Sequence, residues 1–159
     1  MPDSAIRSAL DEAVKAVLER MFFIAAGDPL SPGAAAEPSV QVRLTFEGEP
    51  SGSLHLRVAL PAARSISADF LGIERAEVSE QQIGEVVCEL ANMICGSLLS
   101  RTDSSATFRL GAPAIVPDVL LFDDPSNSTV CSLDTGSGAL TAILTTESPA
   151  CSAAEKSAY

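Results

Sequence analysis

The sequence predicts one α/β domain of the α+β kind, in which long helices pack on one face of an antiparallel sheet. Its 159 residues suit a single domain, and a hydrophobic content of 47% is enough for a core. Apolar residues recur at helical spacing near the N-terminus and again in mid-chain, whereas other segments alternate as strands do. We assign residues 1–147 to the domain and expect residues 148–159, which are small and polar, to form a disordered tail.

The first helix is predicted over residues 3–24, where apolar positions follow one another at helical spacing. The residues of this apolar stripe are Ile6, Leu10, Val14, Val17, Leu18 and Met21. The prolines and glycines of residues 28–38 then predict a loop, which ends the helical pattern.

Two strands follow at residues 40–46 and 54–60, because apolar and polar residues alternate there with one buried face each. The glycines and proline of residues 48–52 predict a tight connection, so the two strands form an antiparallel hairpin. In this pattern His55 takes an outward position on the second strand.

Pro61 is suited to the first turn of a short helix, which we expect to run to about residue 70 and to end at Gly72. The last third of the chain is predicted to form strands at residues 107–110, 119–122, 129–133 and 140–145. A turn with Gly136, Ser137 and Gly138 separates the last two strands, and it lacks the lysine of a phosphate-binding loop.

The helix predicted at residues 80–100 has the clearest start signal in the sequence. Ser79 and Gln82 have the spacing of a capping box, in which each side chain binds a backbone N–H of the other residue. Val78 and Ile83 have the spacing of a hydrophobic staple, which packs across the same start. These signals place the helix boundary at Ser79.

This helix carries a narrow polar stripe. At about 100° per residue, Glu85, Glu89, Asn92 and Gly96 gather on the side opposite the core face. The core face consists of Ile83, Val87, Leu90, Ala91, Ile94 and Leu98, and the flanks include Cys88, Met93, Cys95 and Leu99. Such apolar flanks indicate burial by another element or by a partner. Glycine costs about 1 kcal/mol within a helix, so Gly96 suggests that another backbone approaches closely.

The charge balance argues against nucleic acids and anionic membranes as partners. The formal net charge is −11, from 21 acidic and 10 basic residues, so the clustered positive charge that phosphates require is missing. A partner with a basic patch suits this chain better. No apolar run approaches the roughly 20 residues of a membrane span, and we expect a cytoplasmic protein.

Metal and nucleophile chemistry are also disfavoured. The four cysteines form no C-x-x-C pair and the chain has one histidine, so we expect no metal site and ordinary thiols in a reducing cytosol. His55 could be combined with serines 104–105 and aspartates 123–124 as a hydrolase set. We reject that set because no Gly-x-Ser-x-Gly elbow is present.

Residues 83–96, IGEVVCELANMICG, resemble the signature helix of the CheX-type chemotaxis phosphatases, within the wider CheC, CheX and FliY group. That signature is Glu-x-x-Asn followed by a glycine four residues later, which here corresponds to Glu89, Asn92 and Gly96. The order of elements over residues 5–146 also resembles the family's order. The resemblance therefore implies the CheC/CheX-like fold.

The resemblance implies a phosphatase that hydrolyses the aspartyl phosphate of a CheY-type response-regulator receiver domain. Asn92 would orient the attacking water and Glu89 would contact the receiver's active-site lysine, so both are assigned as catalytic. Glu85, Met93 and Gly96 border this pair, and we expect them to contact the partner. The chain would need no cofactor of its own, because the receiver would supply Mg²⁺.

One departure concerns the number of sites. The CheC branch has two Glu-x-x-Asn helices, but the first helix here offers Glu12-x-x-Lys15 instead, which favours the CheX branch and implies a homodimer joined through its sheets. The alternative function is a non-catalytic module that uses the same helix to dock on a receiver domain or a flagellar-switch component. A purely structural dimerisation domain is a third hypothesis.

Overall fold

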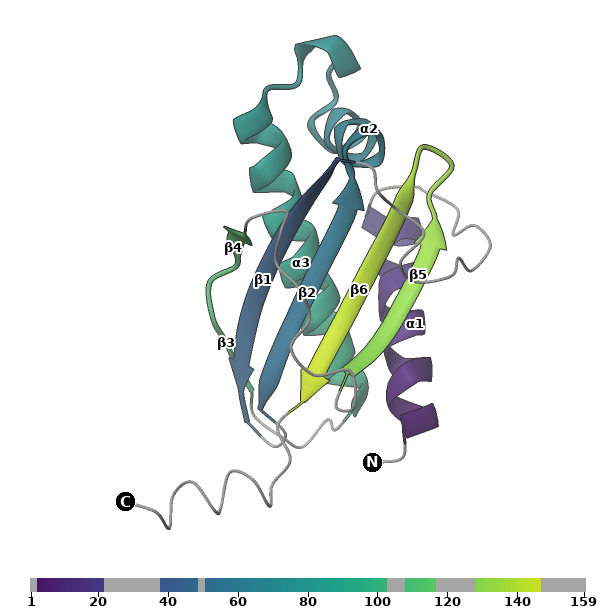
Figure 1. The fold of residues 1–159 in the computed structure, drawn as a ribbon, viewed down its shortest axis with the longest axis vertical. Coiled ribbons are helices and arrows are strands. Elements are labelled where there is room, and N and C mark those ends of the chain that lie inside the picture. The colour runs from purple at the N-terminus through teal and green to yellow at the C-terminus, as the bar shows by residue number, and fades with distance from the viewer. Residues whose placement is uncertain (1–2, 22–37, 49–50, 103–107, 117–127, 147–159) are drawn as a thin grey trace.

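A computed structural model describes residues 3–21, 38–48, 51–102, 108–116 and 128–146. Within these residues, six strands form one antiparallel sheet with helices on one side of it, as Figure 1 shows. In chain order the elements are α1 Asp3–Met21, β1 Ser39–Glu47, β2 Gly52–Ala59, α2 Leu60–Leu71, a 3₁₀ turn Arg75–Glu77, α3 Glu80–Thr102, β3 Arg109–Leu110, β4 Ala114–Val116, β5 Ser128–Asp134 and β6 Ala139–Thr146.

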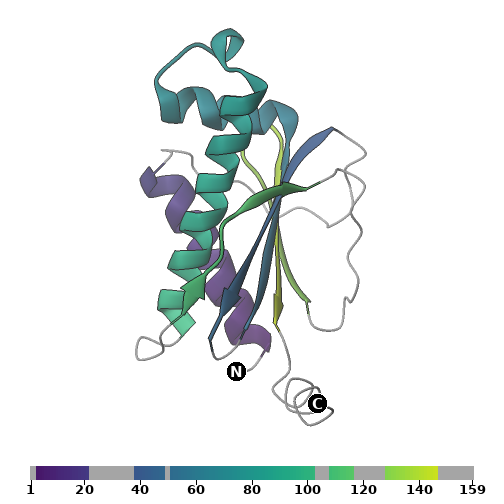
Figure 2. The ribbon, with the colours of Figure 1, turned by 90° about the vertical axis from the view of Figure 1, so that its left-hand side faces the viewer.

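The helices α1 and α3 cover the same face of the sheet, and Figure 2 shows this layer from the side. Helix α3 lies over β1 and β2, whereas α1 lies over β5 and β6 and packs along α3. Helix α2 lies across one end of the sheet, between the hairpin and the start of α3. The predicted fold class is therefore confirmed.

The strand order is β3-β1-β2-β6-β5. Strand β4 also pairs with β1, on the same edge as β3 but at the opposite end of β1. The predicted hairpin pairs Leu44 with Leu54 and Val42 with Leu56, and all four side chains are buried. Leu60 was predicted as the end of the strand but begins α2, because Pro61 follows within the first helical turn, although the Leu60 N–H still donates to the carbonyl of Pro38.

The strand β4 was not predicted from the sequence. Its three residues pair with Gln41, Val42 and Arg43 of β1, and β3 pairs with the far end of the same strand. Strands of two or three residues are too short for alternation to reveal them. The strand predicted at residues 119–122 lies outside the described residues, as do most of the predicted loop at 28–38, residues 22–24 of the first helix, Cys151 and the proposed tail.

The predicted start of the long mid-chain helix and the predicted end of the short helix agree with the structure, and the long helix runs two residues further than predicted, to Thr102. The Ser79 N–H donates to Oε1 of Gln82 at 2.9 Å, and the Gln82 N–H donates to Oγ of Ser79 at 3.1 Å, so the capping box is present. At the end of α2, Gly72 has a φ of 69° and its N–H donates to the carbonyl of Ala68. That left-handed conformation is the reason for glycine at this cap.

The outward position predicted for His55 is wrong. His55 is only 6% exposed, and its Nε2 lies 2.7 Å from Oε1 of Gln41, which is 3% exposed. The sheet register places His55 beside Ile143 of β6, another buried residue. The polar half of an alternating pattern can therefore be buried where a hydrogen bond satisfies it.

Helix α3 contradicts the expectation that no segment approaches a membrane span. Residues Glu80–Arg101 have a mean hydropathy of 1.4 and are long enough to cross a bilayer. In the structure, however, more than half of that stretch is buried against the sheet and α1. The high hydropathy of α3 reflects its place in the core, which is enclosed by the sheet and the two long helices.

Candidate functional site

The apolar face of α3 and its polar stripe point in opposite directions, as predicted. The six residues of the core face are at most 1% exposed: Ile83, Val87, Leu90, Ala91, Ile94 and Leu98. On the other side, Glu85, Glu89 and Gly96 are exposed and Asn92 is partly exposed. The sheet therefore turns this stripe outward along the helical layer of the molecule.

Glu89 and Asn92 lie side by side, because residues three apart are neighbours on a helix surface. Within the part of the chain that the structure describes, neither side chain has a hydrogen bond or an ion pair. Glu85 differs, since its Oε1 accepts a hydrogen bond from Nε2 of Gln81 at 3.1 Å. Glu89 and Asn92 thus keep a carboxylate and an amide available to a molecule outside the chain.

Gly96 lies one turn beyond Asn92 and has open space above it. A Cβ atom built at Gly96 would meet no atom within 4 Å, apart from the helix's own backbone. No contact within the described residues therefore explains why glycine stands at this exposed helical position, although glycine disfavours the helix. Gly96 leaves room for a partner's backbone beside Asn92.

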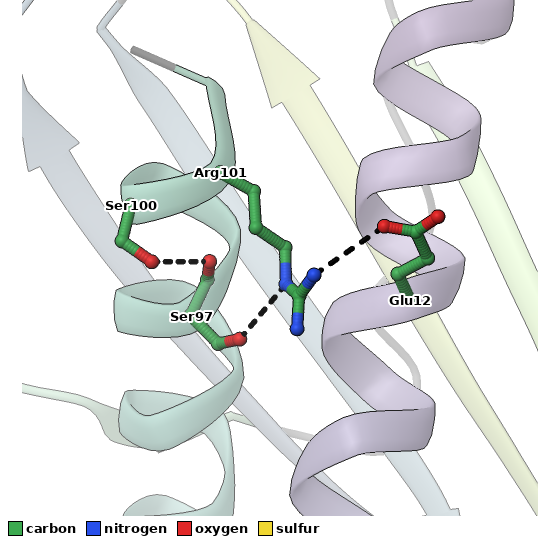
Figure 3. A network of polar contacts seen from close by, with 4 residues as sticks. All are labelled: Glu12, Ser97, Ser100 and Arg101. Atoms are coloured by element: carbon green, nitrogen blue, oxygen red, sulfur yellow. Dashed lines mark hydrogen bonds and ion pairs between the residues drawn. The ribbon is translucent and has the colours of Figure 1, made fainter. Parts of the chain in front are cut away.

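Met93, Ser97 and Arg101 are four residues apart and therefore form one row along α3. This row faces α1. Figure 3 shows the polar contacts at the end of this row: Arg101 donates to Oε2 of Glu12 at 3.3 Å and to Oγ of Ser97 at 3.4 Å. Met93 itself is partly buried and packs against the core. This flank of the stripe is thus covered by α1.

Where a second Glu-x-x-Asn pair would stand, α1 has Glu12 and Lys15. Glu12 pairs with Arg101 of α3, and Lys15 pairs with Asp11 at 2.9 Å. Both residues of the Glu12-x-x-Lys15 pattern are therefore engaged in ion pairs within the chain. Within the described residues, α1 therefore presents no second Glu-x-x-Asn pair beside the one on α3.

The opposite flank faces the edge of the sheet. Cys95 and Leu99 are buried there by the protein itself, and Cys88 is partly buried. Gly84 is buried because Ile115 of β4 lies over it, and a Cβ on Gly84 would come 2.5 Å from Cδ1 of Ile115. Ile115 was not recognised in the sequence, and the one signal was the isolated Gly84 within a helical pattern.

The three cysteines among the described residues, two on α3 and Cys131 on β5, are poor nucleophiles. Burial raises the pKa of Cys95 and of Cys131 to about 12. Burial also raises the pKa of Cys88, and the nearby Glu85 carboxylate adds to that rise. Among the described residues, no three histidine, cysteine, aspartate or glutamate side chains could together hold a metal ion. Among the described residues, the groups that the polar stripe of α3 offers for chemistry are therefore the Glu89 carboxylate and the Asn92 amide.

The family model for "Chemotaxis phosphatase CheX" matches residues 40–134, which include α3 and most of the sheet. The chain belongs to the CheX family. The match runs through Glu89, Asn92 and Gly96, so the exposed pair lies within the matched region. No curated protein sequence matches the chain significantly.

Solved CheX structures have the same fold. CheX from Vibrio vulnificus superposes with a TM-score of 0.74 at 18% identity, over 92% of this chain and 99% of that one. CheX in the CheX–CheY–BeF3–Mg²⁺ complex from Borrelia burgdorferi gives 0.72 at 15% identity, over 89% and 97%. CheX from Desulfovibrio desulfuricans gives 0.71 at 20% identity, over 89% and 99%.

Proposed function

We propose that this CheX-family protein hydrolyses the aspartyl phosphate of a CheY-type receiver domain and so ends a chemotaxis or two-component signal. The observation that carries the proposal is the pair Glu89 and Asn92, exposed side by side on α3 without a partner among the described residues. The complex of the Borrelia burgdorferi relative with CheY supports a receiver as the partner class. We expect the protein in the cytoplasm, where such receivers act.

In the proposed reaction, the side-chain amide of Asn92 enters the receiver's active site and holds a water molecule in line with the phosphorus. The water oxygen forms a bond to phosphorus while the bond from phosphorus to the aspartyl oxygen breaks. The products are inorganic phosphate and the free aspartate of the receiver. Phosphoryl transfer depends mainly on such positioning, so this chain needs no nucleophile of its own.

An amide is suited to this role because it is neutral. A carboxylate at the same place would repel the phosphoryl oxygens, whereas an amide both donates and accepts a hydrogen bond. The receiver would provide the Mg²⁺ that offsets the phosphate charge, and Glu89 would form an ion pair with the receiver's active-site lysine. That ion pair fixes the docking geometry, and the net charge of −11 favours a basic partner surface.

The decisive experiment mixes the protein with phosphorylated receiver and Mg²⁺ and follows the loss of phosphate. We expect Asn92→Ala to reduce the acceleration by at least a hundredfold, since the water loses its orientation, while binding of the receiver persists. Gln81→Ala is the matched control: it removes an exposed amide about three turns away on the same helix. This control should stay within about twofold of the wild-type rate.

The alternative is a non-catalytic module that binds a receiver or a flagellar-switch component through α3. In that case the wild-type protein would bind its partner without accelerating dephosphorylation, and Asn92→Ala would change nothing in the rate. A purely structural dimerisation domain would show neither binding nor acceleration, and Glu89→Ala would be as silent as Asn92→Ala. Binding and hydrolysis are therefore measured on the same samples.

A further inference from the structure

Ile115 is an isoleucine with an exposed fraction of 61%, the highest among the large apolar side chains that the structure describes. It belongs to β4, where Ile115 pairs with Val42 and the preceding Ala114 pairs with Arg43. Cross-strand partners share a face of the sheet, and Val42 is fully buried beneath the helices. Ile115 therefore points to the helical side of the sheet, and the exposed Ala114 points to the other side.

On the helical side, Ile115 lies over Gly84, the glycine whose added Cβ would come 2.5 Å from Cδ1 of Ile115. This contact therefore joins two residues that are each unfavourable at their position: a glycine inside a helix and an isoleucine exposed to water. Gly84, Cys88 and Asn92 form one row of α3, so Ile115 lies about 12 Å along the helix from Asn92.

The two flanks of the stripe differ in character. On the α1 side, the nearby exposed group Arg101 is charged and already paired with Glu12 of α1. On the β4 side, the exposed Ile115 and the partly buried Cys88 present apolar surface, with Cys88 one turn from Asn92 and Ile115 one turn further along the helix. A specific interface covers about 800 Å² on each partner and has a dry, apolar centre, which two polar side chains cannot provide.

We propose that Ile115 is a docking residue, against which the receiver domain packs an apolar side chain while its phosphorylated site lies over Glu89 and Asn92. Gly84 serves this contact by letting β4 lie close to α3. The inference rests on the receiver as partner, and it is independent of whether the phosphate is hydrolysed. The surface that decides which receiver binds would then be the edge formed by β4, Cys88 and Asn92.

The test compares Ile115→Glu with Ala114→Glu, which places the same charge on the adjacent residue and the opposite face. The probe is a panel of purified CheY-type receivers from the same cell, each loaded with beryllofluoride and Mg²⁺ as a stable phosphate mimic. For the receiver that binds wild type, we expect Ile115→Glu to weaken the affinity at least tenfold and Ala114→Glu to change it less than twofold. Both variants should stay folded, because both side chains are exposed, and Ile115→Glu should lower the unfolding temperature only by the loss of its contact with Gly84.

Gly84→Ala gives a second variant that adds no charge. The added methyl group must displace Ile115, so we expect receiver affinity to fall several-fold without loss of folding. In the hydrolysis assay, Ile115→Glu should raise KM and leave kcat within about twofold, unlike Asn92→Ala.

The outcomes separate this inference from the catalytic proposal. If wild type binds a receiver without hydrolysing its phosphate, and Ile115→Glu weakens that binding, the docking inference stands and the phosphatase proposal fails. Equal affinities of Ile115→Glu and wild type would overturn the docking inference, as would binding of no receiver at all. If Ile115→Glu instead changes only the self-association of the chain, the surface belongs to a second copy and the inference is wrong.

Discussion

At the scale of single residues, the polar groups of this protein divide into those with internal partners and those without. Gln41 and His55 are buried and joined by a hydrogen bond, whereas Glu89 is exposed and unpaired among the described residues. Substituting a residue of the second kind costs little stability, since no described contact is lost. Buried polar groups with internal partners affect folding, and those that titrate, such as His55, make stability depend on pH.

His55 leads to a prediction about that dependence. Burial, together with the positive charges of Arg43 and Arg57, lowers the pKa of His55 below its usual value of 6.5. Between that lowered pKa and 6.5, the unfolded chain binds more protons than the folded one. The free energy of unfolding should therefore be largest above pH 6.5, fall as the pH drops below it, and level off below the folded pKa.

Urea unfolding at a series of pH values between about 8 and 5 measures this slope. We expect His55→Gln to flatten it. The control is Asp11→Asn: burial tends to raise the pKa of Asp11, but hydrogen bonds from Lys15 and Cys131 outweigh burial and lower it below 3.8. Asp11 therefore acts at lower pH, and its variant should retain the slope near pH 6.5. A slope that survives in His55→Gln would contradict the assignment.

At the scale of elements, α3 combines two tasks on one helix. Its buried face supplies much of the core, and its outward stripe carries the proposed site. Its two glycines differ in environment, since Gly84 is covered by Ile115 and Gly96 is open. Gly96 lowers the stability of the helix, and no contact within the described chain requires a glycine there. We therefore expect a partner to approach the helix closely at Gly96.

Gly96→Ala is therefore expected to separate stability from function. The new methyl group enters open space and favours the helix by up to about 1 kcal/mol. For a domain of this size the unfolding temperature should rise by about 2–4 °C. At the same time, receiver binding and dephosphorylation should weaken several-fold, because the methyl group occupies the place of the partner's backbone.

Calorimetry and the dephosphorylation assay, applied to the same preparation, measure both effects of Gly96→Ala. Ser100→Ala, near the end of the same helix, is the control for the assay, and we expect it to leave the dephosphorylation rate unchanged. If Gly96→Ala is stabilised and fully active, no partner approaches closely at Gly96.

At the scale of the whole molecule, the two long helices divide the sheet between them. Helix α3 covers β1 and β2, next to the edge where β3 and β4 attach, while α1 covers β5 and β6. Strand β5 is seven residues long and, within the described residues, has no neighbour on its outer side. Such an edge is suited to pairing with a second copy, which would leave both α3 stripes accessible.

We therefore expect a homodimer joined through β5, with a mass twice that of the chain in sedimentation equilibrium. Val130→Lys, on the face of β5 away from the helices, should shift the protein toward monomer, because a lysine on an edge strand disfavours its pairing with another strand. Asn92→Ala should remain a dimer. A wild-type protein that is monomeric at micromolar concentration would contradict the expectation.

The sequence alone determined the long elements and the polar pair. Helical and strand periods located α1, the β1–β2 hairpin and α3, and the capping box placed the start of α3 to the residue, because these features depend on neighbours close in sequence. The same local geometry put Glu89 and Asn92 side by side, opposite the core face. The family resemblance, confirmed by the family match, added the chemistry that geometry could not supply.

Only the tertiary structure decided what surrounds these elements. The burial of His55, the short strand β4 and the contact of Ile115 with Gly84 all join residues that are distant in sequence. Periodicity reports which face of an element is apolar, but not what covers the other face or where the sheet ends. Packing therefore decides that one flank of α3 is charged and the other apolar. It also decides the surface that we propose for docking of the receiver.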